Sequence, residues 1–258
     1  MAKKIIFILK EEGLIALLTY SLNFIQGKGY GTSSIKQEIN AVSKFLDPAN
    51  AKLCIDAGGN IGDYTAGIRS HFLKAEVFTF EPSPTNIAKL NLRFNNDGIV
   101  NIEPYALSDF SGPVKLYSNE EGSALGSLTK RDLSHMNIDF DTYETSEAIR
   151  FYDFWVEKLQ KRPIDLLKLD IEGHELSALN GFGEALNNIK VIQFEFGGCN
   201  IDTRTFWKDF WDILSTNGFK IYRITPFGNV EIKNYRYTDE YFVTTNFLAV
   251  AQLEVPKI

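Results

Sequence analysis

The stretch Asp56-Ala-Gly-Gly-Asn-Ile-Gly62 decides which fold this chain can adopt. It ends an apolar run at 53–56, which we interpret as a buried strand, and a segment with helical spacing follows it. A chain that turns sharply from strand into helix beneath a ligand needs residues without a Cβ atom, and Gly58, Gly59 and Gly62 provide them. Such a turn is also common as mere packing, so its meaning depends on the rest of the chain.

Strand patterns alternate with helix patterns on both sides of this turn. Strands are predicted at 53–56, 77–81, 100–105, 114–117, 164–170, 191–196, 220–225 and 247–250. Helices are predicted at 34–46, 63–72, 84–94, 151–161, 175–186 and 206–214. This order predicts an α/β, doubly wound, Rossmann-like domain, with a mainly parallel sheet of about seven strands and helices on both faces. Ligands of such sheets bind at the carboxyl ends of the strands.

Length and composition indicate one folded domain at 51–258, preceded by an N-terminal helical extension at 1–50. The 258 residues are 44% hydrophobic and carry a formal net charge of -6, from 27 basic and 33 acidic side chains. That balance argues against a protein whose main partner is nucleic acid, because such affinity comes from Lys and Arg at phosphates. Cys54 and Cys199 have no ligand spacing, so neither a disulfide nor a zinc site is expected.

The apolar stretch Ile5–Phe24 raises the question of a leader or a membrane span. Lys10, Glu11 and Glu12 interrupt it, and the uncharged piece 13–27 is shorter than the roughly 20 apolar residues a bilayer requires. No small-residue cleavage site follows, so we expect a cytoplasmic protein. The helix is expected to pack on the body or on a second copy of the chain, and peripheral contact with a membrane surface is the alternative.

A carboxylate at the end of the next strand gives the glycine turn its meaning. Glu81, in Phe78-Thr-Phe-Glu-Pro82, falls 19 positions after Gly62. At this spacing a carboxylate accepts hydrogen bonds from ribose hydroxyls, which indicates an adenosine-type cofactor. Asp56 and Asp63 flank the turn and suit a cationic sulfonium and amine better than a pyrophosphate, which favours S-adenosylmethionine. An NAD-dependent oxidoreductase stays open as an alternative.

Five segments, in order, resemble the motifs of the FkbM family of O-methyltransferases. They are Asp56-Ala-Gly-Gly-Asn-Ile-Gly-Asp-Tyr-Thr65, Phe80-Glu-Pro82, Ala106-Leu-Ser-Asp109, Leu166-Leu-Lys-Leu-Asp-Ile-Glu-Gly-His-Glu175 and Gln193-Phe-Glu-Phe-Gly-Gly198. The resemblance covers about Leu53 to Val250. It implies a class I methyltransferase sheet with an antiparallel seventh strand, bound S-adenosylmethionine, and methyl transfer to a hydroxyl, most often of a sugar, a glycan, a glycolipid or a natural product.

The resemblance also implies cofactor-binding residues in three places. The methionine and ribose parts would be lined by Asp56, Gly58, Asn60 and Gly62. Glu81 would hold the ribose diol. The adenine would be bordered by a turn formed by Ala106, Leu107, Ser108 and Asp109, for which an ordinary turn between elements is the alternative.

Methyl transfer to a hydroxyl requires alignment of the acceptor oxygen and removal of its proton. Asp170, at the end of the fourth core strand, is the first candidate for this task, and Glu172, His174 and Glu195 are expected at the same rim. His174 has an unperturbed pKa near neutrality, but its segment also fits a helix N-terminus. The carboxylates permit a divalent cation such as Mg²⁺, with Asp170 and Glu195 as candidate ligands, although the spacing does not demand one.

The polar stretch Glu120–Thr145 is expected to be an irregular insertion beside the site. We predict acceptor contacts from Ser123, Ser127, Lys130 and Arg131, and a solvated loop is the alternative.

Two other functions stay open: a methyltransferase acting on nucleic acid or protein, and a non-catalytic binding protein with the same fold. Asp170-Ile-Glu-Gly stands where enzymes that methylate the amino groups of bases carry Asn or Asp, then Pro-Pro and an aromatic residue, which counts against the nucleic-acid reading.

Overall fold

The computed structural model describes residues 10, 12–29 and 34–252. The helices are α2 (Gly13–Ile25), α3 (Ile35–Val42), α4 (Asp63–His71), α5 (Pro84–Phe94), α6 (Phe151–Glu157), α7 (Glu175–Phe182), α8 (Cys199–Thr203) and α9 (Trp207–Thr216). The strands are β1 (Leu53–Ala57), β2 (Glu76–Phe80), β3 (Val100–Glu103), β4 (Ala106–Ser108), β5 (Gly112–Ser118), β6 (Thr142–Arg150), β7 (Ile164–Leu169), β8 (Ile189–Phe196), β9 (Phe219–Thr225), β10 (Gly228–Ile232) and β11 (Thr245–Ala251). Three 3₁₀ turns are η1 (Ser134–Met136), η2 (Gly183–Asn188) and η3 (Tyr237–Asp239).

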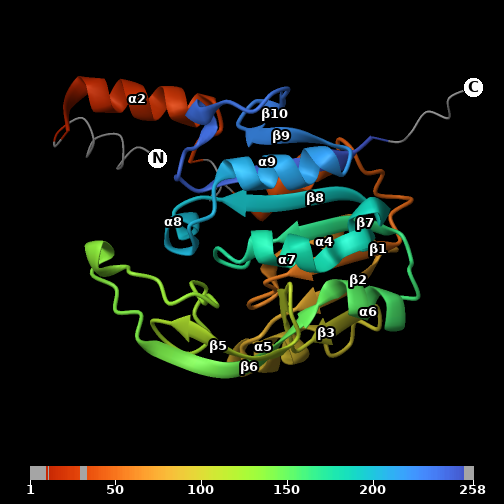
Figure 1. Ribbon diagram of the computed structural model, residues 1–258. Coiled ribbons are helices and arrows are strands. Elements are labelled where there is room, and N and C mark those ends of the chain that lie inside the picture. The colour runs from red at the N-terminus through yellow and green to blue at the C-terminus, as the bar shows by residue number, and fades with distance from the viewer. Residues whose placement is uncertain (1–9, 11, 30–33, 253–258) are drawn as a thin grey trace, which may run out of the picture.

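The main sheet has the strand order β10-β9-β11-β8-β7-β1-β2-β3 (Figure 1). The five strands β3, β2, β1, β7 and β8 pair in parallel, whereas β11 runs antiparallel to both of its neighbours, β8 and β9. The predicted α/β fold, its mainly parallel sheet and its antiparallel strand are therefore confirmed. The sheet has eight strands because 228–232 forms an additional edge hairpin with β9.

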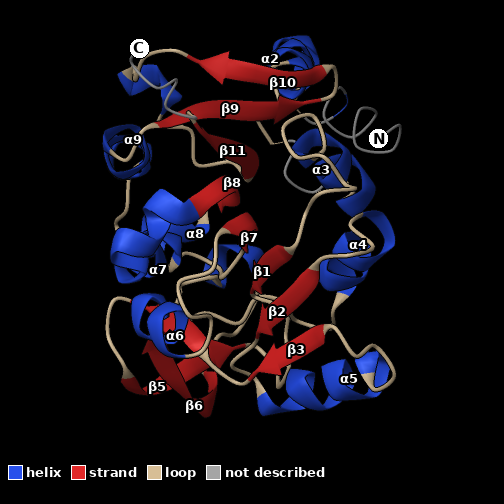
Figure 2. Ribbon diagram, turned by 90° about the vertical axis from the view of Figure 1, so that its right-hand side faces the viewer, coloured by secondary structure: helices blue, strands red, loops and turns tan. Residues whose placement is uncertain are grey.

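Helices cover both faces of this sheet (Figure 2). Along β1, Leu53 and Ile55 pack into the core beneath α6, α7 and α9, whereas Cys54 packs into the core beneath α3 and α4. This alternation is the period of two that a strand imposes on its side chains. Ile39 and Val42 of α3 are buried in the second core, so part of the N-terminal 50 residues packs directly on the sheet.

The region expected to be an irregular insertion, 120–145, ends in a long strand that continues beyond it. β6 (Thr142–Arg150) pairs with β5 over seven residue positions and with β4, which makes a separate three-stranded sheet. Neither face of β6 is deeply buried, so it lacks the apolar alternation by which a strand is predicted. Cross-strand contacts replace it: the rings of Tyr117 and Tyr143 lie 6.0 Å apart, and the Lys115 ammonium lies 4.1 Å from the Tyr143 ring centre. The stretch 106–108, for which an ordinary turn was the alternative, is strand β4.

The helix predicted at 175–186 ends early. α7 stops at Phe182 because Gly183 adopts a φ of +51°, and the chain continues as the 3₁₀ turn η2. Similarly, α6 stops at Glu157 rather than at 161, and Gln160 and Lys161 follow with positive φ angles.

The N-terminal helix α2 is attached to the body at its carboxyl end, where Phe24 packs against the second core. The Asn23 amide donates to the Tyr241 hydroxyl at 2.9 Å, and the Gly29 N–H donates to Thr245 Oγ1 at 3.1 Å. α2 has no buried residue, and Ile15 is 81% exposed. The earlier part of the apolar stretch, 5–9, lies outside the described residues, as does Glu11. None of the helices in residues 10, 12–29 and 34–252 is long and apolar enough to cross a bilayer.

Candidate active site

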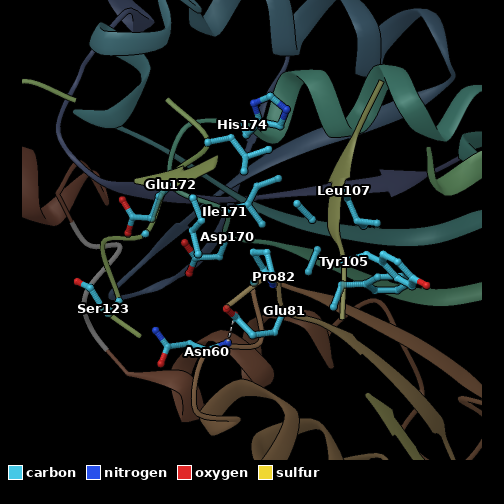
Figure 3. A pocket seen from close by; sticks show the side chains of 18 residues that line it. Asn60, Glu81, Pro82, Tyr105, Leu107, Ser123, Asp170, Ile171, Glu172 and His174 are labelled. Atoms are coloured by element: carbon cyan, nitrogen blue, oxygen red, sulfur yellow. Dashed lines mark hydrogen bonds between the residues drawn. The ribbon is translucent and has the colours of Figure 1, made fainter. Parts of the chain in front are cut away.

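A pocket opens at the carboxyl ends of β1, β2 and β7, where the fold predicts a ligand site (Figure 3). Its walls come from the glycine turn, the ends of these strands, the start of α7, the β3–β4 connection and the insertion. The lining residues are Ala57, Gly58, Asn60, Phe80, Glu81, Pro82, Tyr105, Ala106, Leu107, Leu116, Ser123, Ala124, Gly126, Leu128, Asp170, Ile171, Glu172 and His174.

The glycine turn is held tightly between β2 and β7. The N–H groups of Gly58 and Gly59 both donate to the Phe80 carbonyl at 3.0 Å. Gly58 has a φ of +87°, and a Cβ atom at this position would lie 1.9 Å from the Asp170 carbonyl oxygen. Only glycine fits there, and the bare backbone of this turn forms the floor of the pocket.

Two residues of the motif support the turn without lining the pocket. A Cβ at Gly62 would lie 2.5 Å from the Phe94 ring, so Gly62 allows α5 to pack against the turn. Asp56 is buried, and its Oδ2 accepts a hydrogen bond from the Thr65 hydroxyl at 2.6 Å. Burial raises the pKa of Asp56 to about 6. The family resemblance implies that both residues line the cofactor directly, and that role stays a prediction. The period of two turns the Asp56 side chain toward α4, and neither residue is part of the pocket lining.

Glu81 lies where the sequence predicts a ribose-binding carboxylate. Its Oε2 accepts the Asn60 N–H at 2.7 Å (Figure 3). Its Oε1 accepts the Ser83 N–H at 2.9 Å. Each carboxylate oxygen can accept a further hydrogen bond, and Glu81 lines the pocket. Burial raises the pKa of Glu81, although these N–H donors lower it. Asn60 has a φ of +46°, a strained conformation that aims its N–H at Glu81.

The predicted adenine-side residues divide into two groups. Ala106 and Leu107 line the pocket, whereas Ser108 is buried behind it and Asp109 is exposed. The Ser108 hydroxyl lies 3.0 Å from His174 Nε2 and donates to Asp109 Oδ1 at 3.1 Å. Burial lowers the pKa of His174, which is therefore neutral at pH 7.

A row of buried polar side chains crosses four strands just beneath the pocket. Thr79, Asp56, Lys168 and Gln193 are paired residues on β2, β1, β7 and β8, and each is at most 2% exposed. Lys168 and Gln193 are not among the site residues predicted from the sequence. The signal was available, because a lysine inside the dense apolar strand Ile164–Leu169 needs a buried counter-charge.

Lys168 joins this row to the catalytic candidates. Its Nζ lies 3.1 Å from Asp170 Oδ2 and 3.8 Å from Glu38 Oε2, and the Gln193 amide also donates to Glu38 Oε2 at 2.5 Å. Burial lowers the pKa of Lys168, but the carboxylates of Asp170, Glu38 and Glu195 outweigh it, so the pKa is raised and the ammonium stays charged. Glu38 comes from α3, so a helix outside the motif region contributes to the site.

A second cleft meets the first pocket at Asp170 and Glu172, which line both. It lies between the insertion, α8 and the segment that precedes β11. Its walls are Leu125, Arg131, Asp132, Leu133, His135, Met136, Asp170, Glu172, Glu195, Gly198, Cys199, Ile201, Asp202, Phe242 and Thr244. Of the four catalytic candidates, Asp170, Glu172 and Glu195 thus lie on this cleft. His174 lines only the first pocket.

The carboxylates at the junction perturb one another. Burial, and next the Asp170 carboxylate, raise the pKa of Glu172 to about 7, although Arg131 lowers it from 2.7 Å away. Burial and Asp170 also raise the pKa of Glu195 well above its usual range. Glu172 has a φ of +53°, and strained residues of this kind cluster at functional sites.

The four insertion residues predicted to contact an acceptor lie in different places. Arg131 lines the second cleft and Ser123 lines the first pocket. The buried Ser127 hydroxyl donates to the Glu172 carbonyl at 2.7 Å, so it supports the junction from behind. Lys130 pairs with Asp141 at the surface and lines neither cavity, so its contact with an acceptor stays a prediction.

Comparison with known proteins adds to this geometry. The sequence model of the methyltransferase FkbM domain matches residues 56–221, which is more than half of the chain. The chain belongs to the FkbM methyltransferase family. A relative, 2-O-methyltransferase NoeI from Sinorhizobium fredii, is 27% identical over 197 residues, which cover 73% of this chain and 80% of that protein.

Two further proteins are similar to this FkbM methyltransferase. Hexuronic acid methyltransferase AglP from Haloferax volcanii is 29% identical over 150 residues, which cover 54% of each chain. A solved rRNA methylase from Streptococcus thermophilus aligns with a TM-score of 0.47 at 10% identity, covering 84% of this chain and 95% of that one.

The FkbM methyltransferase described here depends on S-adenosylmethionine, and its first pocket fits that cofactor. Glu81, Asp170 and Glu172 present carboxylates to the pocket, and none of the residues that line it is a Lys or an Arg. Such a wall suits a sulfonium and an amine, whereas a pyrophosphate would meet repulsion. Glu81 would hold the ribose diol, and the apolar residues around Leu107 would hold the adenine.

The candidate metal ligands, Asp170 and Glu195, do not form a site that fits a divalent cation. Within residues 10, 12–29 and 34–252 no three His, Cys, Asp or Glu side chains converge as ligands. The buried Lys168 ammonium contacts Asp170 and interacts with Glu195, the two candidate ligands, so the counter-charge that a cation would supply is already present.

Proposed function

We propose that this FkbM methyltransferase transfers the methyl group of S-adenosylmethionine to a hydroxyl group of a sugar, within a glycan or a glycolipid. The observation that carries the proposal is the junction of the two cavities. A carboxylate-lined pocket suited to an adenosyl sulfonium opens, at Asp170 and Glu172, into a second cleft that can hold an acceptor.

Bound S-adenosylmethionine supplies an electrophilic methyl group on its sulfonium. The acceptor oxygen would take this methyl group, and sulfur would keep the electron pair of the bond that breaks. The hydroxyl proton must leave in the same process. We assign this proton to the Asp170 carboxylate, which lines both cavities and is oriented by the Lys168 ammonium at 3.1 Å.

The other candidates receive different roles in this proposal. Glu172 faces both cavities and balances the positive charge of the sulfonium, while Glu195 hydrogen-bonds the acceptor on the side away from the cofactor. His174 is assigned to the wall of the cofactor pocket, because it does not line the second cleft and its Nε2 already contacts Ser108.

The relatives support a sugar as the acceptor. One is named a 2-O-methyltransferase and another a hexuronic acid methyltransferase. The acidic walls of the second cleft support the same reading, since a nucleic-acid backbone would need free Lys and Arg. The residues 51–258 would form the catalytic domain, with α3 completing the polar row beneath it.

The exposed apolar side chains of α2 support a contact with a second copy of the chain or with a membrane surface. Sedimentation and co-flotation with vesicles distinguish these two partners.

The test of the proposed function is a screen for transfer of a tritiated methyl group to glycans, glycolipids and small hydroxylated acceptors. Asp170→Asn should lose most turnover, while its affinity for the cofactor stays within a few-fold of the parent. Asp153→Asn, at an exposed carboxylate on α6, is the matched control and should keep full turnover. Transfer to none of the acceptors by a protein that binds the cofactor would refute the proposal, and unaltered turnover of Asp170→Asn would remove Asp170 from the mechanism.

A further inference from the structure

We infer that the second cleft accepts a sugar without negative charge and discriminates against acceptors that carry a carboxylate, such as uronic acids. This inference rests on the proposed function and narrows its substrate class. It follows from the charges on the walls of the cleft, from the pairing of its arginine and from the apolar side chains at its rim.

Carboxylates dominate the walls. Asp132, Asp170, Glu172, Glu195 and Asp202 line the cleft, against a single Arg131 and His135. Carboxylate oxygens accept hydrogen bonds from sugar hydroxyls. A neutral sugar brings no charge that must lose its water on binding. A carboxylate brought into the same cleft would add a like charge beside Asp132, Asp170 and Asp202 and would lose its water.

The one arginine on these walls is already neutralised. Its guanidinium contacts Glu172 through Nη1 at 2.7 Å and Asp202 through Nε at 3.3 Å. The Arg131 side chain is only 9% exposed, and its guanidinium lies 6.0 Å from the centre of the Phe140 ring. A ligand carboxylate would have to compete with these two protein carboxylates for the cation. Arg131 therefore serves to hold the two walls together and is not available as an anion receptor.

The rim of the cleft offers apolar surface instead of charge. Met136 of η1 is 57% exposed, Ile201 of α8 is 60% exposed, and Phe242 lines the same cleft. α8 and the yellow-green insertion lie at the same edge of the molecule in Figure 1. Apolar side chains of this kind pack against the non-polar faces of sugar rings or against an apolar aglycone. The carboxylates of the walls and the apolar side chains of the rim together suit an uncharged glycoside.

The test compares matched acceptors that differ only at C6. Alkyl glucosides, galactosides and mannosides are each offered beside the corresponding uronide, and kcat/KM for methyl transfer is measured at pH 7.5. We expect at least a tenfold preference for the neutral member of every pair that is methylated. Equal or better transfer to the uronides would overturn the inference while leaving the proposed function intact.

A variant tests the assigned cause. Asp202→Asn removes one of the two carboxylates that hold Arg131, so the ratio of uronide to neutral kcat/KM should rise at least threefold. Asp141→Asn removes a carboxylate from the same insertion, outside the cleft, and should leave the ratio unchanged. An unchanged ratio in Asp202→Asn would refute the role given to Arg131 and with it the charge argument.

Binding measurements keep the inference testable if the proposed function fails. Each pair is titrated by calorimetry into protein saturated with S-adenosylhomocysteine. Tighter binding of the neutral glycosides supports the inference even without turnover. Tighter binding of the uronides, or binding of neither, overturns it.

Discussion

Replacement of Lys168 by Met should destabilise the protein in a manner that depends on pH. The lysine neutralises the buried Glu38, whose side chain is 10% exposed, and also Asp170, whose side chain is 39% exposed. Removal of one partner of a buried ion pair costs about 3–5 kcal/mol, whereas a solvent-exposed pair contributes about 0–1 kcal/mol. Because Asp170 is partly solvated and Glu38 lies 3.8 Å away, we expect the low end, a loss of about 3 kcal/mol in the free energy of unfolding at pH 7.

The sign of the pH dependence follows from Glu38. Burial raises the pKa of Glu38 and Lys168 opposes that shift, so the pKa should rise further in Lys168→Met. The folded variant then binds a proton that the unfolded chain releases, and its stability falls as pH rises from the ordinary carboxyl pKa to the raised one. The difference in stability between the parent and the variant should therefore shrink between pH 7 and pH 5.

Urea unfolding of the parent, Lys168→Met, Glu38→Gln and the double variant measures both effects. The double variant should be less destabilised than the sum of the single variants, with a coupling of about 1–2 kcal/mol, because the residues are in contact. Losses that are additive within error, together with a stability difference that stays constant from pH 7 to pH 5, would refute the buried ion pair.

Further predictions concern the glycine turn and the junction of the cavities. Gly58→Ala should destabilise the fold by more than about 1 kcal/mol and abolish cofactor binding, because its Cβ would meet the Asp170 carbonyl. The control Gly98→Ala has open space around its Cβ and should change neither thermal unfolding nor cofactor binding by calorimetry. Equal behaviour of the two variants would contradict the role of the turn. Since the pKa of Glu172 is about 7, its carboxylate gains negative charge as pH rises through 7. The ratio of the affinity for cationic S-adenosylmethionine to that for S-adenosylhomocysteine, whose sulfur is neutral, should rise with pH. Glu172→Gln should remove that dependence in calorimetry from pH 6 to pH 8, and a retained slope would assign it to another group.

The main architecture could be predicted because the strands that build it are buried and mostly apolar. Ile164–Leu169 and Ile189–Phe196 are buried along almost their whole length, so their runs of large apolar residues identify them directly. The predictions failed where pairing rather than burial makes the strand. β6 and β10 expose most of their residues, and their partners β5 and β9 supply the hydrogen bonds that define them.

Some residues of the candidate site could also be predicted from the sequence, and others could not. Glu81 and Asp170 were predictable because each follows a strand at the edge where parallel strands present their ligands. Whether Asp56 and Gly62 line the pocket or support it depends on which face of the turn each occupies, and the motif does not contain that information. Glu38 contacts Lys168 through tertiary packing of α3, which no spacing along the chain reveals.

The central claim is that the pocket near Glu81 is shaped for an adenosyl sulfonium, and calorimetry with S-adenosylmethionine and S-adenosylhomocysteine tests it most directly. We predict binding of both by the parent protein, no heat with NAD, and at least a tenfold weaker affinity in Glu81→Gln, which keeps the size of the side chain. A tenfold loss corresponds to about 1.4 kcal/mol, the scale of one hydrogen bond to a charged group. A well-folded parent protein that gives no heat with either adenosyl compound would contradict the account.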